Sequence, residues 1–278
     1  ITNAAVVLTL KVFILSPPES KIFVYNFDGE FVKTIRCSET ISDIYFIDNM
    51  ILCYSKNRNC SVEHSFEIID VNGDNIKYFP NIYRCSLARG SVSFMSEICF
   101  YLYDNALHIK ELFSDTVFQL RFPNFEGKFI LDRKIKKPNP TIRENFGDIE
   151  QLKGLKNTYI FDRMIFEFGN FIYYQVFHRQ KGFLTIFSKN EPWLIYPFQS
   201  TGIVNDVDNG PEFWIQASNE RNQAISWVFA HELKAHVASD AFKNSTPKYP
   251  EKKRELERLA NSLSENDNPV LMIVKLKE

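Results

Sequence analysis

The chain has 278 residues, of which 45% are hydrophobic and 24% charged, so it can bury a sizeable core and is not disordered. Its 33 Lys and Arg against 34 Asp and Glu give a formal net charge of -1, which disfavours a generic nucleic-acid binder. No run reaches the roughly 18 uninterrupted apolar residues of a membrane-spanning helix. The 26 Phe and 12 Tyr favour strands that pack through aromatic faces.

A hairpin pattern occurs early in the chain and then repeats. Lys21–Ile35 reads KIFVYNFDGEFVKTI and Ser65–Phe79 reads SFEIIDVNGDNIKYF, which puts Gly29 and Gly73 at matching positions 44 residues apart. The Asp-Gly and Asn-Gly pairs tolerate positive φ at both central positions, as a two-residue type I′ turn requires. We therefore predict two tight hairpins.

Two further copies follow, at His108–Leu120 and at Gly182–Phe198. Further strand-like sequence precedes the last three copies, at Ser42–Tyr54, Ser91–Tyr103 and Asn170–Arg179. A period in the low forties made of about four short strands is typical of propeller blades. The prediction is an all-β fold, a β-propeller of four-stranded antiparallel blades, with about four to five blades visible.

The composition of the first repeated strand separates this fold from its alternatives. Ile22 and Val24 lie on one face and Phe23 and Tyr25 on the other, so both faces are largely apolar, as stacked blades require. A two-sheet sandwich would show one polar face per strand, and a parallel α/β sheet would need a helix between strands.

Two segments break the period of this single predicted domain, residues 1–278. Residues 127–164 form an insertion rich in Lys, Arg and Pro, and residues 230–266 carry two predicted helices. In the second helix a leucine stripe is predicted to lie on the blade edges; its members are Leu256, Leu259 and Leu263. The apolar run Asn268–Leu276 is predicted to return as a strand of the last blade.

Four segments of the sequence resemble a known family. They are DGEFV at Asp28–Val32, SDTVFQL at Ser114–Leu120, the helix at His231–Ser245 and ENDNPVLMIVKLK at Glu265–Lys277. Together they are similar to the six-bladed β-propeller family of bacterial cell-envelope proteins, which is related to NHL-repeat and TolB-like propellers. The resemblance covers essentially the whole chain, and its C-terminal block is the most specific part.

The resemblance implies an exported protein of the bacterial cell envelope, periplasmic or associated with the outer membrane and often lipid-anchored in its precursor form. It implies no settled biochemical function. Members usually carry a signal peptide and one or two further blades before the segment that corresponds to Lys11–Ile35. Since four to five blades are visible here, the closure of the ring and the completeness of the chain are left open.

Five cysteines are scattered without a CxxC pair, so the ligand spacing of a zinc ribbon or a thioredoxin-like site is absent. Cys53 and Cys99 sit inside apolar strand runs and are predicted to be small buried hydrophobes. Cys37, Cys60 and Cys85 lie in loop-like sequence, where a disulfide could form if the protein is exported.

The candidate ligand-binding residues are basic and aromatic. The run that includes Lys134, Lys136, Lys137 and Arg143 could hold an acidic ligand at a propeller mouth, or form a solvated loop. Trp193 follows a predicted turn and could stack on a sugar, although packing between strands is the plainer interpretation.

Candidate metal ligands are few. Asp206 and Asp208 lie two residues apart in a loop and are the first candidates if a cation binds. The DVNGD segment that begins at Asp70 is interpreted as a hairpin turn. His231 and His236 stand five apart on a predicted helix and cannot share a metal as an i, i+4 pair does.

No GxSxG, P-loop or dinucleotide-binding motif occurs in the sequence, and no catalytic residue is predicted. The leading hypothesis is a non-catalytic binding protein of the cell envelope, with a protein or glycan partner and no cofactor. The alternative is a propeller enzyme, a lyase or hydrolase, with its site at the mouth of the central channel.

Overall fold

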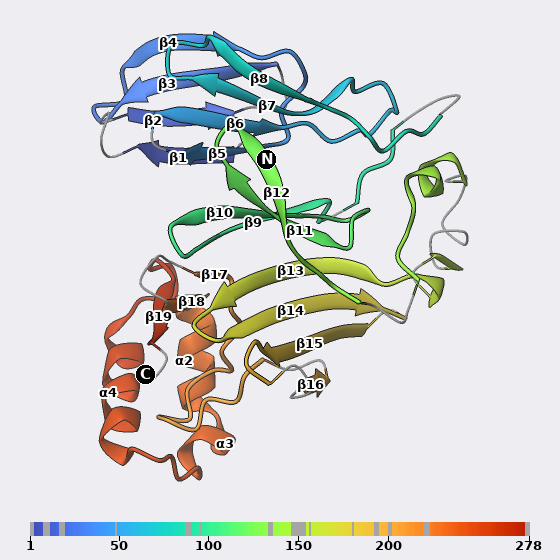
Figure 1. The fold of residues 1–278 in the computed structure, drawn as a ribbon. Helices are drawn as coiled ribbons and strands as arrows, with labels where there is room; N and C mark the ends of the chain where they lie inside the picture. The colour runs from blue at the N-terminus through green and yellow to red at the C-terminus, as the bar shows by residue number, and fades with distance from the viewer. Residues whose placement is uncertain are drawn as a thin grey trace. The chain divides into compact units, whose positions relative to one another are not determined.

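The structure of this chain is a computed structural model. It describes residues 3–7, 12–16, 20–47, 49–86, 91–94, 96–132, 136–145, 154–155, 157–179, 181–191, 195–199, 202–218 and 223–275, with backbone alone at 3–7, 12–16 and 195–199. Among these residues the strands form five antiparallel sheets, four of them four-stranded (Figure 1).

The first two sheets are simple meanders in which consecutive strands pair. The first contains β1 (Asn3–Val7), β2 (Val12–Ser16), β3 (Lys21–Asn26) and β4 (Phe31–Arg36). The second contains β5 (Asp43–Ile47), β6 (Met50–Tyr54), β7 (His64–Asp70) and β8 (Asn75–Pro80).

The third and fourth sheets repeat this order. The third contains β9 (Ile98–Tyr103), β10 (Ala106–Glu111), β11 (Thr116–Arg121) and β12 (Asn124–Ile130). The fourth contains β13 (Phe161–Phe168), β14 (Phe171–His178), β15 (Lys181–Ser188) and β16 (Ile195–Gln199). The predicted fold of four-stranded antiparallel sheets is confirmed.

The fifth sheet has three strands, β17 (Ala217–Ser218), β18 (Gln223–Val228) and β19 (Val270–Lys275). β19 pairs with β18 from Val270 to Lys275, so the prediction of a C-terminal strand is confirmed. Between these two strands the chain forms three helices, one more than predicted: α2 (Ala230–Ala238), α3 (Asp240–Lys243) and α4 (Pro250–Ser262).

The repeated hairpins form as predicted, but their turns are of another type. Gly29 has φ 82° and donates its N–H to the Asn26 carbonyl, while Asp28 keeps negative φ. The strand register shifts after Val24, so the glycine occupies the bulge that follows a type I turn. The Asn26 side chain favours this turn because its Oδ1 accepts the N–H groups of Asp28 and Glu30.

The chain divides into two compact units. The first consists of residues 1–100 and 109–161, and the second of residues 101–108 and 162–278. In the first unit the repeated strands supply the core: Ile22 is fully buried and Val24 nearly so, together with Ile35, Ile41, Ile51, Cys53 and Ile69. The prediction for Cys53 is confirmed, whereas Cys99 is half-buried.

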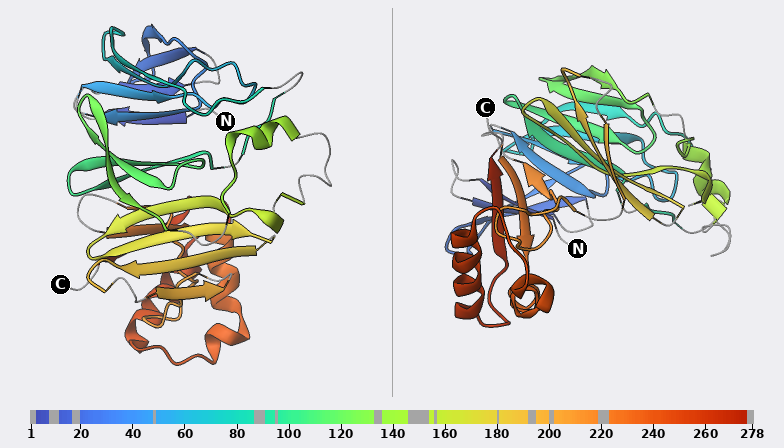
Figure 2. Two further views of the ribbon diagram at one scale, coloured as in Figure 1. Left: turned by 45° about the vertical axis from the view of Figure 1, so that its right-hand side comes forward. Right: turned by 90° about the horizontal axis from the view of Figure 1, so that it is seen from below.

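In the second unit the helices cover one face of the last sheet (Figures 1 and 2). Val270 and Met272 of β19 pack with Val228, Leu233, Val237, Phe242 and Ala260. The leucine stripe of α4 is only partly used: Leu256 and Leu263 pack against this cluster, but Leu259 is 42% exposed because Ala260 takes the buried position.

The segment between β12 and β13 is shorter than the predicted insertion, because β12 extends to Ile130 and β13 begins at Phe161. It contains the 3-10 helix η1 (Pro140–Asn145). Ile142 of this helix packs with Leu112 and Phe113, so the segment contributes to the core of the first unit. The organisation of the whole chain as a single propeller domain stays a prediction.

Candidate ligand pocket

A pocket of about 200 Å³ opens in the first unit between the strand pair β7–β8 and the strands β10, β11 and β12. Its walls are mainly apolar. The lining residues are Ser65, Phe66, Phe79, Pro80, Ile82, Ile109, Glu111, Phe118 and Phe125. Pockets of this kind, with apolar walls and few polar groups, are typical of small-molecule sites.

Three phenylalanines from three strands form one wall. The ring of Phe125 on β12 lies 5.2 Å from that of Phe66 on β7 and 4.5 Å from that of Phe79 on β8, between centroids. Phe66 and Phe79 meet edge to face at 6.3 Å. Each such pair contributes about 0.5 to 1.5 kcal/mol beyond the area it buries, which makes the wall rigid.

A register irregularity in β7 shapes one side of the pocket. Side chains of a regular strand alternate between the two faces of the sheet. The pairing of β7 with β8 shifts between His64 and Phe66, which breaks this alternation. As a result the consecutive residues Ser65 and Phe66 both line the pocket.

Glu111, at the end of β10, is the acidic residue of the pocket lining. The residue is 8% exposed, and the hydroxyl of Tyr83 donates to its Oε2 at 2.9 Å. Burial raises the pKa of Glu111 to about 7, although the Tyr83 hydrogen bond and the charge of Lys110 act in the opposite direction. Near neutral pH this carboxyl group is therefore divided between its two protonation states.

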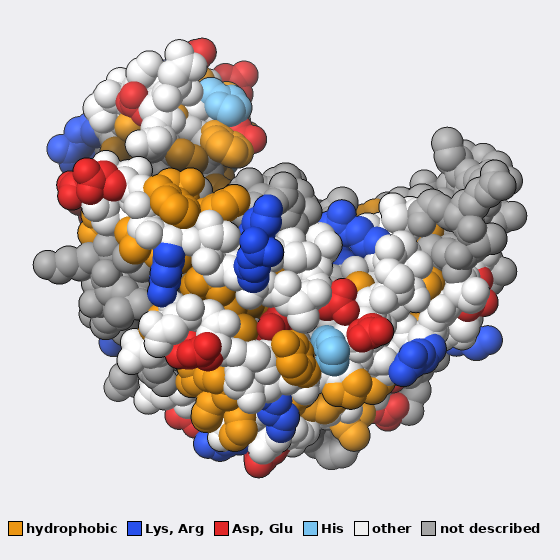
Figure 3. All heavy atoms as spheres, turned by 90° about the horizontal axis from the view of Figure 1, so that it is seen from above, with side chains coloured by type: hydrophobic (Ala, Val, Ile, Leu, Met, Phe, Trp, Pro, Cys, Tyr) orange, Lys and Arg blue, Asp and Glu red, His pale blue; other side chains and the backbone are white. Residues whose placement is uncertain are grey.

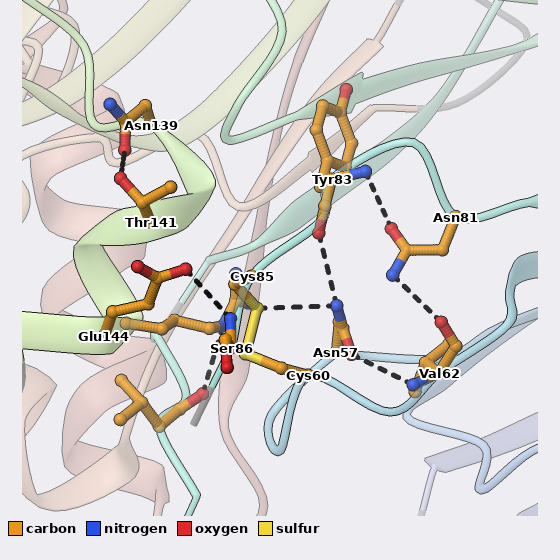
Figure 4. Close-up of a disulfide and its surroundings, with 12 residues drawn as sticks. Asn57, Cys60, Val62, Asn81, Tyr83, Cys85, Ser86, Asn139, Thr141 and Glu144 are labelled. Carbon is orange, nitrogen blue, oxygen red and sulfur yellow. Dashed lines mark hydrogen bonds between the residues drawn. A yellow bond between two sulfur atoms is a disulfide. The ribbon is translucent and has the colours of Figure 1, made fainter. Parts of the chain in front are cut away.

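Tyr83 is held in place by a network on the segment that leaves β8 (Figure 4). Its carbonyl accepts from Asn57 Nδ2 at 3.2 Å, and its N–H donates to Asn81 Oδ1 at 2.9 Å. Asn81 Nδ2 in turn donates to the carbonyl of Val62 at 3.0 Å. Two buried amide side chains therefore fix the partner of Glu111.

A disulfide joins the loop between β6 and β7 to the segment that follows β8. Cys60 and Cys85 are bonded, with Cα atoms 5.3 Å apart, and 25 residues separate them in the chain. Of the three loop cysteines, Cys37 is not in this bond; its Sγ lies 4.0 Å from Sγ of Cys53. The sequence indicated the loop cysteines, but their pairing depends on which loops meet in space.

An ion pair lies behind the aromatic wall. The guanidinium of Arg143 on η1 pairs with Glu97, and both side chains are almost fully buried, at 1% and 2% exposure. The guanidinium also lies over the rings of Phe113, at 4.9 Å, and Phe94. Tyr54, whose ring is 5.1 Å from Phe66, has its pKa raised by burial and by the charges of Glu97 and Glu111.

Comparisons with known proteins place the chain in a family. The family model described as "Domain of unknown function (DUF4934)" matches residues 7–275. The chain belongs to the DUF4934 family. No curated protein matches the sequence.

Solved structures similar to this DUF4934 chain include three proteins of different origin. A Bacteroides fragilis protein named "putative exported protein" has a TM-score of 0.66 at 15% identity, over 99% of this chain and 77% of its own. A DUF4221 family member from Bacteroides vulgatus has a TM-score of 0.47 at 11% identity, over 68% of this chain and 64% of its own. The β-propeller domain of Cps50 (Swd1) from Myceliophteria thermophila has a TM-score of 0.46 at 8% identity, over 81% of this chain and 62% of its own.

The DUF4934 chain has an all-β, propeller-like fold built from four-stranded antiparallel sheets. The finer resemblance to six-bladed NHL-repeat and TolB-like propellers stays a prediction, as do the lipid anchor and the periplasmic location. In the described part of the chain no helix is long and apolar enough to cross a membrane.

The predicted basic ligand site is dispersed in this DUF4934 structure. Arg143 is buried against Glu97, so the picture of a solvated loop does not hold for it. Lys137 pairs with Asp115 at 2.7 Å and Lys136 is exposed. Lys134 and Trp193 lie outside the described residues. On the face drawn in Figure 3, basic and acidic side chains are interspersed, as the balanced charge predicts.

Two of the aspartates considered as metal ligands, Asp208 and Asp70, accept hydrogen bonds within their own turns instead. Asp208 Oδ1 accepts from Asn205 Nδ2 at 2.7 Å and from the N–H of Gly210 at 2.8 Å, and Asp206 is exposed. Asp70 Oδ1 accepts three backbone N–H groups of its hairpin, which lower its pKa. Among the described residues no cluster of three His, Cys, Asp or Glu side chains could hold a metal ion.

A second polar cluster, which the sequence did not indicate, lies inside the second unit. Glu167 on β13 accepts from the hydroxyl of Tyr101 at 2.9 Å and pairs with Lys189 at 2.7 Å. The ring of His108 stacks on Tyr101, and its Nε2 is 3.8 Å from Glu167 Oε1. Glu167 and His108 are 3% and 0% exposed, so these two side chains are shielded from solvent and link strands of the unit.

Sequence reasoning missed the pocket because its polar group carries no motif. Glu111 ends the segment HIKE, an ordinary strand sequence. The signal that was available is an acidic residue within an apolar strand run, a position where a carboxylate is costly without a partner. Glu67 and Glu167 are also acidic residues within apolar strand runs, and both are buried.

Proposed function

We propose that this DUF4934 protein is an exported, propeller-like binding protein that holds a compact apolar ligand in the pocket beside Glu111, without chemical turnover. The observation that carries the proposal is the pocket itself: four phenylalanine rings and one carboxyl group converge around about 200 Å³. This combination supplies affinity through apolar burial and orientation through one polar group.

The composition of the pocket supports binding rather than catalysis. Among the described residues that line it, Glu111 is the one ionisable side chain. The hydroxyl of Ser65 donates to Asn81 Oδ1 at 3.3 Å, so its hydrogen bond goes to an amide oxygen and not to a base. Nucleophilic catalysis needs such a base within hydrogen-bond reach of the nucleophile.

The disulfide supports export, because disulfides persist in oxidising compartments and are rare in the cytosol. The name of the Bacteroides fragilis relative, "putative exported protein", points in the same direction. We therefore propose the cell envelope as the location, with the ligand drawn from small molecules or from exposed groups of a protein or glycan partner.

A matched pair of variants tests the pocket. Ile82 at its rim is 70% exposed, and Ile130, which does not line the pocket, is 71% exposed. Ile82→Asp should weaken the binding of neutral aromatic probes such as toluene or indole by about tenfold or more, roughly 1.4 kcal/mol, because it places a charge beside the apolar site. Ile130→Asp should leave binding unchanged.

Binding is measured by ligand-observed NMR on the full chain with the disulfide intact. Failure of every aromatic probe to bind, or an equal loss in both variants, would refute the pocket as the site. Turnover of ester or glycoside substrates that Glu111→Gln abolishes would favour the enzyme alternative instead.

A further inference from the structure

The pocket lining has an electrostatic bias. It contains four phenylalanines and one acid, and no basic residue among those described. The face of an aromatic ring carries negative potential, so rings attract cations as well as apolar groups. The carboxylate of Glu111 adds a full negative charge in the same space when it is ionised.

One ring of the wall already attracts a cation. Lys77 of β8 places its Nζ 5.2 Å from the centroid of Phe79, one of the lining rings. Lys77 also donates to the side chain of Asn124, which lies next to Phe125 in the chain. The geometry of this lysine shows that a ring of the wall is accessible to an ammonium group.

We propose that the pocket recognises an organic ammonium ion: a primary amine on a compact aromatic or alkyl body, with the ammonium beside Glu111 and the body against the phenylalanine rings. This assignment rests on the proposed binding function and names its ligand class. The composition of the lining, in which Glu111 is the one acid and most other side chains are apolar, matches a ligand that is polar at one end only.

The volume limits the size of that ligand. An engineered apolar protein cavity of roughly 150 Å³ holds one benzene molecule. The pocket here measures about 200 Å³, so it accommodates one phenyl ring and a short amine chain. 2-Phenylethylamine is therefore a suitable probe, and 2-phenylethanol is its neutral match.

The charges around Glu111 determine how binding varies with pH. Tyr83 donates to the carboxyl group, and the ammonium of Lys110 donates to the Glu111 carbonyl at 2.7 Å. Tyr54 from β6 lies near it. Three further charged or titratable groups of the neighbouring elements have partners of their own: Glu97 with Arg143, His64 of β7 with the Tyr78 ring, and Lys77 with Phe79.

The sign of the pH dependence follows from Glu111. Its pKa in the unliganded protein is about 7, so the carboxyl group is mostly neutral at about pH 6 and mostly ionised at about pH 8. An ammonium ion binds better to the ionised form, and its affinity should rise with pH across this interval. A neutral alcohol gains no such advantage.

The experiment is a calorimetric titration of the full, disulfide-bonded chain with both probes at the two pH values. At about pH 8 the amine should bind at least about tenfold more tightly than the alcohol, and at about pH 6 this preference should shrink to about threefold or less. Glu111→Gln should abolish the preference at both pH values. Glu126→Gln, an exposed acid of β12 outside the lining, should preserve it.

The outcomes separate this inference from the proposed function. Equal binding of amine and alcohol at both pH values would overturn the ammonium assignment while leaving an apolar binding pocket in place. Binding of neither probe would overturn both. The pH dependence of the unmodified protein decides the case even if the Glu111→Gln chain does not fold.

Discussion

At the residue scale, the buried carboxyl groups are the features that set this chain apart from a purely apolar sheet stack. Glu67 accepts the N–H and hydroxyl of Ser38 at 2.9 Å, and Glu167 accepts from Tyr101 and pairs with Lys189. These two acids are satisfied by several partners. Glu111 has the Tyr83 hydrogen bond and a pocket beside it, and its pKa is raised by burial.

Glu111 should therefore make the folded state less stable as pH rises. Its pKa is about 7 in the folded chain against an ordinary value of 4.5, so between these values the folded state holds a proton that the unfolded state has lost. Stability is lost as pH rises through this window and is constant above it. Glu111→Gln, which cannot ionise, should gain on the order of 1 to 3 kcal/mol relative to the parent between about pH 5 and about pH 8.

Thermal melting of both chains at the two pH values measures this difference, with Glu126→Gln as the control. An effect of Glu111→Gln that is the same at both pH values would show that the carboxyl group ionises normally in the folded chain.

At the element scale, the connection from β8 to β9 is fixed by covalent and polar ties rather than by regular structure. The Cys60–Cys85 disulfide joins it to the β6–β7 loop, and the N–H of Ser86 donates to Glu144 Oε1 at 2.9 Å (Figure 4). Ile82 at the pocket rim and Tyr83 beside Glu111 both belong to this connection, which follows Pro80 at the end of β8. The disulfide therefore supports the pocket as well as the fold.

Removing the disulfide should destabilise the chain and weaken ligand binding together. The double variant Cys60→Ser, Cys85→Ser should lose about 2 to 4 kcal/mol, because the unfolded chain regains the entropy of an open loop. The reductant dithiothreitol should lower the melting temperature of the parent chain and of Cys37→Ala, whose disulfide is intact, but not that of the double variant. A parent chain insensitive to reductant would contradict this role.

The strand β19 allows a second element-scale prediction from one matched pair. Met272 packs beneath the helices α2 and α4, whereas its neighbour Ile273 is 56% exposed on the other face. Met272→Asp should cost several kcal/mol because it puts a charge into the cluster, and Ile273→Asp less than about 0.5 kcal/mol. Urea unfolding monitored by Trp fluorescence measures both losses of unfolding free energy. Similar losses in the two variants would contradict the assignment of Met272 to the buried face of β19 and Ile273 to the exposed face.

At the scale of the whole molecule, the sequence predicted the repeats but not the sites between them. Hairpin strands depend on local alternation and turn residues, which is why β3–β4, β7–β8 and β15–β16 follow the predicted positions. The turn type escaped prediction because a bulge register and the Asn26 side chain outweigh the Asp-Gly pair. The Asp-Gly pair at the centre of the turn therefore does not determine the turn type alone.

Long-range features were out of reach for a different reason. Arg143 is basic and follows two prolines, which predicts a solvated loop, yet Glu97 and the Phe113 ring enclose it. The convergence of Phe66, Phe79 and Phe125 likewise requires two sheets to be placed against each other, and the pairing of Cys60 with Cys85 requires the β6–β7 loop to meet the connection that follows β8. A single sequence gives the identity of these residues but does not show that they are in contact in the folded chain.

The most direct test of the central claim is a crystal structure of the full chain with 2-phenylethylamine at a pH above 7. The claim predicts the phenyl ring of the probe packed against the rings of Phe79 and Phe125 and its nitrogen within hydrogen-bond distance, about 3 Å, of the Glu111 carboxylate. Density for the amine elsewhere, or an empty pocket in crystals whose protein binds the amine in solution, would contradict it.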